Sequence, residues 1–159
     1  MRLALFQPDI PQNLGSALRL CACLDVALDV IEPCGFPLSD RAIRRAAMDY
    51  GGQADVTRHD SWAAFVSGRD DWPQAARLVL FTTKGAEPYQ NFQFGPHDIL
   101  LMGRESAGVP DEVHNAADAR LLIPMRPGMR SINVINAAAM ALGEALRQTQ
   151  AFAPTPPIA

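Results

Sequence analysis

The sequence predicts a single α/β domain in which a six-stranded, mainly parallel sheet carries helices on both faces. Segments of strand character alternate with segments whose apolar residues recur at helical spacing, and that alternation is typical of a parallel sheet wrapped by helices. Two strand-like segments, 77–83 (RLVLFTT) and 98–103 (DILLMG), are almost continuously apolar. Such runs indicate strands that are covered on both faces.

The first half of the chain supplies three strands and three helices. They are predicted in the order strand 2–6, helix 11–25, strand 27–32, helix 39–52, strand 54–59 and helix 61–68. Pro11 stands near the start of the first helix, where its missing N–H costs little. The second helix opens with Ser39 and Asp40 and ends at the pair Gly51 and Gly52, which are common start and stop signals.

The second half adds the two apolar strands, a third strand and two helices. The third strand is predicted at 120–125, a short helix at 110–116, and a final helix with Ser131 as a candidate N-cap. We find no repeat or linker, so one domain is predicted over 1–150. The last residues, 151–159 (AFAPTPPIA), are expected to form a flexible tail.

Composition and charge limit the classes of function. Hydrophobic residues make up 48% of the chain and charged residues 19%, and the formal net charge is −3, which argues against a generally basic nucleic-acid binder. No signal peptide and no apolar run of about 18 residues occurs, so a cytoplasmic protein without membrane contact is expected. Cys21, Cys23 and Cys34 show no metal-binding spacing and are expected to be free, buried thiols, with no metal site.

Three predicted strands end in unusual segments. These segments are FTTKG (81–85), MGRESAG (102–108) and IPMRPGMRS (123–131). Ligands of parallel sheets bind beyond the carboxyl ends of the strands, so we expect one shared pocket there. The first strand-to-helix turn lacks G-x-G-x-x-G, and no Walker A sequence occurs. Their absence argues against NAD, FAD and ATP, and against methyltransferases with a glycine-rich first turn.

The final helix carries amides among its apolar turns. The segment RSINVINAAAMALGEAL (130–146) has apolar residues on two adjoining stripes, and Asn133 and Asn136 lie on a third line. Buried amides require hydrogen-bond partners. We expect Asn133 to brace the neighbouring loops near Glu105, and Asn136 to reach the same loops or a second copy of the chain.

Arginine dominates the basic residues, with thirteen Arg and one Lys, and its planar guanidinium suits phosphate contacts. Arg41, Arg44 and Arg45 are spaced to share one helical face. That face is either simply solvated or a patch that contacts RNA phosphates. Arg126 and Arg130, which follow the sixth predicted strand, are further candidates for RNA contact.

Three motifs in order resemble a known family. They are N-x-G-x-x-x-R (Asn13, Gly15, Arg19), G-x-E-x-x-G (Gly103, Glu105, Gly108), and IPM followed by S-x-N-V. The chain resembles the SpoU branch of the SPOUT RNA 2′-O-ribose methyltransferases over about residues 2–150. Within that branch it is most similar to members that modify the wobble nucleotide, position 34, of tRNA.

The resemblance implies a deep trefoil knot in the C-terminal half and an obligate homodimer built partly from the first and last helices. It implies S-adenosyl-L-methionine as the cofactor and the tRNA anticodon stem-loop as the partner. The expected cofactor-binding residues are Phe81, Thr82, Gly103, Ile123, Met125 and Ser131. The expected catalytic residues are Asn13, Arg19, Glu105, Ser131 and Asn133.

The resemblance also suggests how Arg19 acts. The family's first-motif arginine faces the ribose hydroxyl and is thought to act with the cofactor pocket of the other subunit. Since a guanidinium stays protonated, we interpret Arg19 as an orienting, alkoxide-stabilising cation. Two alternatives stay open: a SpoU-type enzyme for another tRNA or rRNA nucleotide, and a non-catalytic α/β module that binds nucleotides or RNA.

Overall fold

A computed structural model describes residues 1–38, 55–84 and 87–154. Within these ranges the sheet has seven strands in the order β3-β2-β1-β6-β4-β7-β5, and each neighbouring pair is parallel. The α/β prediction is therefore confirmed. The predicted number of six strands is wrong by one, because the two-residue strand at the β5 edge was not expected. The trefoil knot stays a prediction.

The elements follow the predicted order closely. The strands are β1 (Arg2–Phe6), β2 (Ala27–Ile31), β3 (Val56–His59), β4 (Leu78–Phe81), β5 (Glu87–Pro88), β6 (Ile99–Met102) and β7 (Ala119–Leu122). The α-helices are α1 (Pro11–Leu24), α3 (Trp62–Ser67), α4 (Asp111–Ala116) and α5 (Val134–Thr149), and two 3₁₀ turns are η2 (Gly68–Asp71) and η3 (Tyr89–Asn91). The helix predicted at 39–52 lies outside the described residues.

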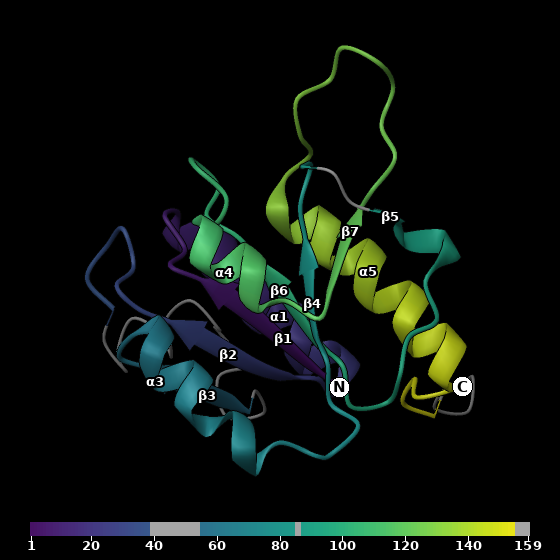
Figure 1. The fold of residues 1–159 in the computed structure, drawn as a ribbon, viewed down its shortest axis with the longest axis horizontal. Helices are drawn as coiled ribbons and strands as arrows, with labels where there is room; N and C mark the ends of the chain where they lie inside the picture. Colours follow the sequence, from purple (N-terminus) through teal and green to yellow (C-terminus); the bar gives the residue numbers. More distant parts are fainter. Residues whose placement is uncertain (39–54, 85–86, 155–159) are drawn as a thin grey trace, which may run out of the picture.

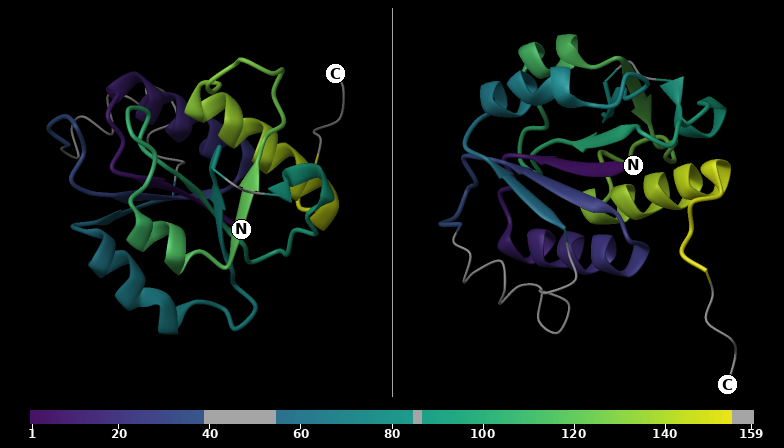
Figure 2. Two further views of the ribbon diagram at one scale, coloured as in Figure 1. Left: turned by 45° about the horizontal axis from the view of Figure 1, so that its top comes forward. Right: turned by 90° about the horizontal axis from the view of Figure 1, so that it is seen from below.

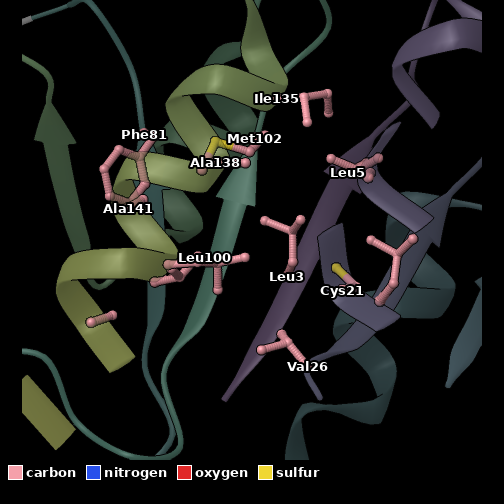
Figure 3. Packing of buried hydrophobic residues seen from close by; sticks show 14 of the residues in the cluster. Leu3, Leu5, Cys21, Val26, Phe81, Leu100, Met102, Ile135, Ala138 and Ala141 are labelled. Carbon is pink, nitrogen blue, oxygen red and sulfur yellow. The ribbon is translucent and has the colours of Figure 1, made fainter. Parts of the chain in front are cut away.

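Helices cover both faces of the sheet (Figure 1; Figure 2, right). On one face α1 and α5 lie side by side and bury Leu3 and Leu5 of β1 together with Met102 of β6. Figure 3 shows these side chains between the sheet and the two helices. On the other face α3 and α4 cover a second cluster that includes Phe6 and Phe65. The alternation of the β1 side chains between the clusters follows from the period of two in a strand.

Helix α5 differs from its predicted form. It begins at Val134 and ends at Thr149, so residues 130–133, which we assigned to the helix, belong to the loop before it. Its inner face is buried along its length, and Met140 on its outer face is 42% exposed. The outer face therefore carries apolar surface that the single chain does not cover.

Two further predictions concern cysteines and the tail. All three cysteines are free, but only Cys21 is buried, whereas Cys23 is exposed and Cys34 is partly exposed. Burial raises the pKa of the Cys21 thiol to about 12, so it stays protonated and unreactive at neutral pH. Residues 151–154 contain no helix or strand, and whether the tail is flexible stays a prediction. In the described part of the chain, no helix has the length and apolarity needed to cross a bilayer.

Candidate functional site

A cleft opens at the carboxyl ends of β4, β6 and β7, where the sequence predicted a shared pocket. Its volume is about 520 Å³, and its walls come mainly from segments 81–84, 102–109 and 123–134. The three strands are neighbours in the sheet, with β4 between β6 and β7, which brings the three loops together. A cleft of this size falls within the range of small-molecule sites.

The expected cofactor-binding and catalytic residues gather in this cleft, with one exception. All six residues of the expected cofactor set line it, namely Phe81, Thr82, Gly103, Ile123, Met125 and Ser131. Of the expected catalytic residues, Asn13, Glu105, Ser131 and Asn133 also line it, whereas Arg19 is exposed on α1 and does not. Their roles stay predictions.

The loop after β6 is a tight turn built on two glycines. The backbone N–H groups of Arg104 and Gly108 each donate to the other residue's carbonyl, at 3.0 and 2.9 Å. Gly108 has a φ of +66°, which side chains disfavour. A Cβ on Gly103 would lie 2.8 Å from the carbonyl carbon of Gly108. Glycine at 103 is therefore required for the loop to fold back on itself.

A chain of hydrogen bonds connects the three sequence motifs. The Glu105 carboxylate accepts from the backbone N–H of Asp9 and from Nδ2 of Asn13, both at 2.8 Å. The Oδ1 atom of Asn13 in turn accepts from Nδ2 of Asn133 at 3.1 Å. Asn13 is only 9% exposed. The network fixes the start of α1, the loop after β6 and the start of α5 relative to one another.

Asn133, rather than Ser131, caps the final helix. Its Oδ1 atom accepts from the backbone N–H groups of Ile135 and Asn136, at 2.9 and 3.2 Å, while Ser131 lies in the loop before it. The prediction that Asn133 braces the loops near Glu105 is correct, with Asn13 as the bridge. Asn133 and Asn136 are nevertheless exposed in the single chain. The expectation that their amides are buried is therefore wrong for this chain alone.

A second contact, which sequence reasoning missed, joins the same two loops. The Asp9 carboxylate accepts hydrogen bonds from the backbone N–H of Ser106, at 3.1 Å, and from the Ser106 hydroxyl. These bonds lower the pKa of Asp9 below its ordinary value of 3.8. Asp9 and Ser106 are 97 positions apart, and only the proximity of the first and second motifs could have signalled the pair.

Cations gather around the cleft. Lys84, Arg104 and Arg130 line it, together with the single carboxylate Glu105 and with His114. The other predicted RNA-contacting residues are placed differently: Arg126 is exposed and does not line the cleft, and Arg41, Arg44 and Arg45 lie outside the described residues. The cleft lining is thus net positive in a chain with a net charge of −3.

Similar sequences point to one family. The model of the SpoU rRNA Methylase family matches residues 1–143. A tRNA (cytidine(34)-2′-O)-methyltransferase of Beijerinckia indica subsp. indica is 61% identical over 151 residues, which cover 95% of this chain and 93% of that protein. A protein of the same name from Ancylobacter novellus is 52% identical over 157 residues, which cover 98% of this chain and 97% of the relative.

Solved structures agree with the sequence comparison. A structure described as giving insights into the 2-OH methylation of C/U34 on tRNA has a TM-score of 0.83 and 40% identity, over 92% of this chain and 94% of the other. The SpoU methyltransferase AviRb from Streptomyces viridochromogenes, in complex with the cofactor AdoMet, has a TM-score of 0.80 and 26% identity, over 93% of this chain and 60% of the other. The chain belongs to the SpoU methylase family.

Proposed function

We propose that this chain transfers a methyl group from S-adenosylmethionine to the ribose 2′-hydroxyl of the wobble nucleotide, C34 or U34, of tRNA. The observation that carries the proposal is the cleft at the sheet's carboxyl edge, where the Glu105–Asn13–Asn133 network joins all three motifs. Relatives that are 61% and 52% identical over nearly their whole length carry the name of this activity.

The cleft suits S-adenosylmethionine in size and lining. Its walls combine apolar side chains, such as Phe81 and Ile123, with exposed backbone and polar groups of the three loops, a combination typical of cofactor sites. Because Gly103 has no side chain, the backbone of Gly108 can lie directly against it in the cleft lining. We propose that Phe81, Thr82, Gly103, Ile123, Met125 and Ser131 hold the cofactor, which when bound supplies an electrophilic methyl group on a sulfonium.

The hydrogen-bond network would act by alignment. Glu105 is held by two donors from the β1–α1 region, so its carboxylate keeps the loops in register rather than serving as a free base. Methyl transfer to oxygen needs the hydroxyl oxygen and the methyl carbon in line, and fixed geometry can lower the barrier substantially. We propose that Asn13, Glu105 and Asn133 supply that fixed geometry.

Arg19 would act on the cleft of a second copy. It does not line the cleft of its own chain, yet it lies on α1, which packs beside α5, and the outer face of α5 exposes Met140. We propose a homodimer formed through α1 and α5, in which Arg19 orients the ribose hydroxyl and stabilises the developing alkoxide. Since arginine does not deprotonate, the hydroxyl proton would leave to water or to a substrate phosphate.

Purified protein, S-adenosylmethionine and tRNA transcripts test the proposed activity, with nucleosides identified by mass spectrometry after digestion. The expected product is 2′-O-methylcytidine or 2′-O-methyluridine at position 34 only. A methyl group on a base or on another nucleotide would contradict the proposal, and so would the absence of any methylated nucleoside.

The same assay tests the role of Arg19. Removing an electrostatic contact to the reacting oxygen should lower the methylation rate of Arg19→Ala by about 10²–10³-fold, and Arg19→Lys should also be impaired because it lacks the planar fork. Near-normal methylation by Arg19→Ala would remove Arg19 from the mechanism, and near-normal methylation by Arg19→Lys would remove the role of the fork. Neighbouring Ser16→Ala, another exposed α1 position, should keep the wild-type rate.

A further inference from the structure

Arg104 occupies a fixed position at the cleft. It lies between Gly103 and Glu105 at the end of β6 and contributes to the cleft lining. Both its backbone N–H and its carbonyl bond to Gly108, so the root of its side chain is held by the tight turn. The side chain projects from a rigid part of the site rather than from a loose loop.

The guanidinium of Arg104 lacks a hydrogen-bonding partner among the described residues. Its Cζ atom lies over the Phe6 ring, 5.8 Å from the ring centroid, at cation–π distance. Its Nε atom is buried without an acceptor among the described residues. The nearby Asp9 carboxylate feels its charge but is bonded to Ser106. The terminal nitrogens of the guanidinium are not buried in the same way and form no hydrogen bond with a described residue, so an oxyanion ligand can accept charge-assisted hydrogen bonds from them.

The guanidinium lies on one side of the cleft lining. Phe6, over which it lies, belongs to the core cluster under α3 and α4. Phe81 and Met102, at the wall of the expected cofactor site, belong to the cluster under α1 and α5 on the opposite face of the sheet. Arg104 therefore lies on the opposite side of the same cleft from Phe81 and Met102, and we assign the anion that it binds to the RNA.

We propose that Arg104 binds a phosphate of the substrate RNA backbone at the cleft and so positions the target ribose. The site rests on the proposed function, because it deepens the description of how the RNA enters the cleft. A planar guanidinium held over an aromatic ring by a cation–π contact can donate two parallel hydrogen bonds to a phosphate. Lys84 and Arg130 add positive charge to the same lining.

Equilibrium binding of a fluorescently labelled anticodon stem-loop RNA, measured over a series of salt concentrations, tests this proposal. Loss of one charged phosphate contact in Arg104→Gln should raise the Kd about tenfold and reduce the slope of log K against log salt by about one. Arg104→Lys should keep the salt slope but recover only part of the affinity. Arg120→Gln is the matched control, because it removes an exposed charge that does not line the cleft.

A calorimetric titration with S-adenosylhomocysteine and a thermal melt complete the experiment. All three variants should bind S-adenosylhomocysteine within about twofold of wild type and melt at a similar temperature. The proposal is overturned if Arg104→Gln binds RNA as wild type does, if it loses no more affinity than Arg120→Gln, or if it loses S-adenosylhomocysteine instead. If the wild-type protein bound no RNA or transferred no methyl group, the proposed function itself would be wrong. If the wild type bound RNA and transferred the methyl group, and Arg104→Gln bound RNA equally well, only the inference about Arg104 would be wrong.

Discussion

Charged side chains are paired at the amino edge of the parallel sheet, whereas those around the cleft at the carboxyl edge have no partner of opposite charge among the described residues. At the amino edge, Asp98 just before β6 is fully buried and accepts from Arg77 at 2.7 and 2.9 Å and from the Gly95 N–H at 2.8 Å. Asp118, just before β7, is bonded to Arg69 and to the N–H of Leu78. Each of these two carboxylates accepts from a cation and from a backbone N–H.

At the carboxyl edge, the cations around the cleft have no carboxylate partner in the described part of the chain, whereas Arg58 of β3 pairs with Glu32 after β2, outside the cleft. Lys84, Arg104 and Arg130 line the cleft, and none forms an ion pair with another described residue. The one lining carboxylate, Glu105, is bonded to an amide and to a backbone N–H instead. The contrast indicates that the amino edge holds the fold, while the carboxyl edge keeps its charges available for a ligand.

The largest expected effect on stability comes from removing the buried Asp98 carboxylate at the amino edge. Asp98→Ala leaves Arg77 without its carboxylate partner and the Gly95 N–H without its acceptor, so it should lower the free energy of unfolding by about 3 kcal/mol. Urea denaturation measures the change. The exposed carboxylate in Asp60→Ala is the control and should cost less than about 0.5 kcal/mol. If folded Asp98→Ala lost methyl transfer while keeping its stability, the division between the two edges would be wrong.

At the carboxyl edge, a substitution should lower the rate of methyl transfer more than it lowers the stability of the fold. Asn13→Ala removes the bridge between Glu105 and Asn133, so we expect methyl transfer to fall at least tenfold, or about 1.4 kcal/mol in barrier height. The free energy of unfolding should fall by only about 1 kcal/mol. The adjacent exposed position, in Gln12→Ala, should change neither quantity. An Asn13→Ala variant with a normal rate would show that the network is structural only.

The smallest effect concerns the Asp9–Ser106 contact and depends on pH. The folded-state pKa of Asp9 lies below its unfolded value near 3.8, so its contribution is present above that value and is lost as pH falls through the folded pKa. Ser106→Ala should therefore be less stable than wild type near pH 6, and the difference in urea midpoint should shrink below about pH 4. A difference that stayed constant down to about pH 2 would count against Asp9 as the partner that matters. Ser16→Ala, whose hydroxyl bonds a helix carbonyl, should show a pH-independent difference.

Much of this arrangement could be predicted from the sequence because its signals are local. Apolar runs such as 98–103 predicted the buried strands, and the unusual segments after them predicted the shared cleft. Strand β5 could not be predicted, since two residues carry no periodicity. Ser131 and Asn133 are both good N-caps, and the choice between them depends on Asn13, which is 120 positions away.

Long-range contacts account for the remaining differences. Burial of Asn133 and Asn136 was inferred from their place in an apolar helix, yet they lie at its exposed N-terminal end, where the preceding loop ends. The partners of Asp9 and the cation–π contact of Arg104 with Phe6 join residues that only the folded sheet brings together. Arg19 belongs to the first motif but does not line the cleft of its own chain, in keeping with the expectation from the resemblance that it acts with the other subunit.

The central claim, that the carboxyl-edge cleft is the cofactor site, is tested most directly by calorimetric titration of S-adenosylmethionine into wild type, Gly103→Ala and Gly68→Ala. A Cβ at Gly103 meets the Gly108 backbone at 2.8 Å, whereas a Cβ at Gly68 meets nothing within 4 Å. Wild type and Gly68→Ala should bind equally, and Gly103→Ala should bind at least tenfold more weakly. Equal binding by all three proteins would contradict the claim and place the cofactor elsewhere.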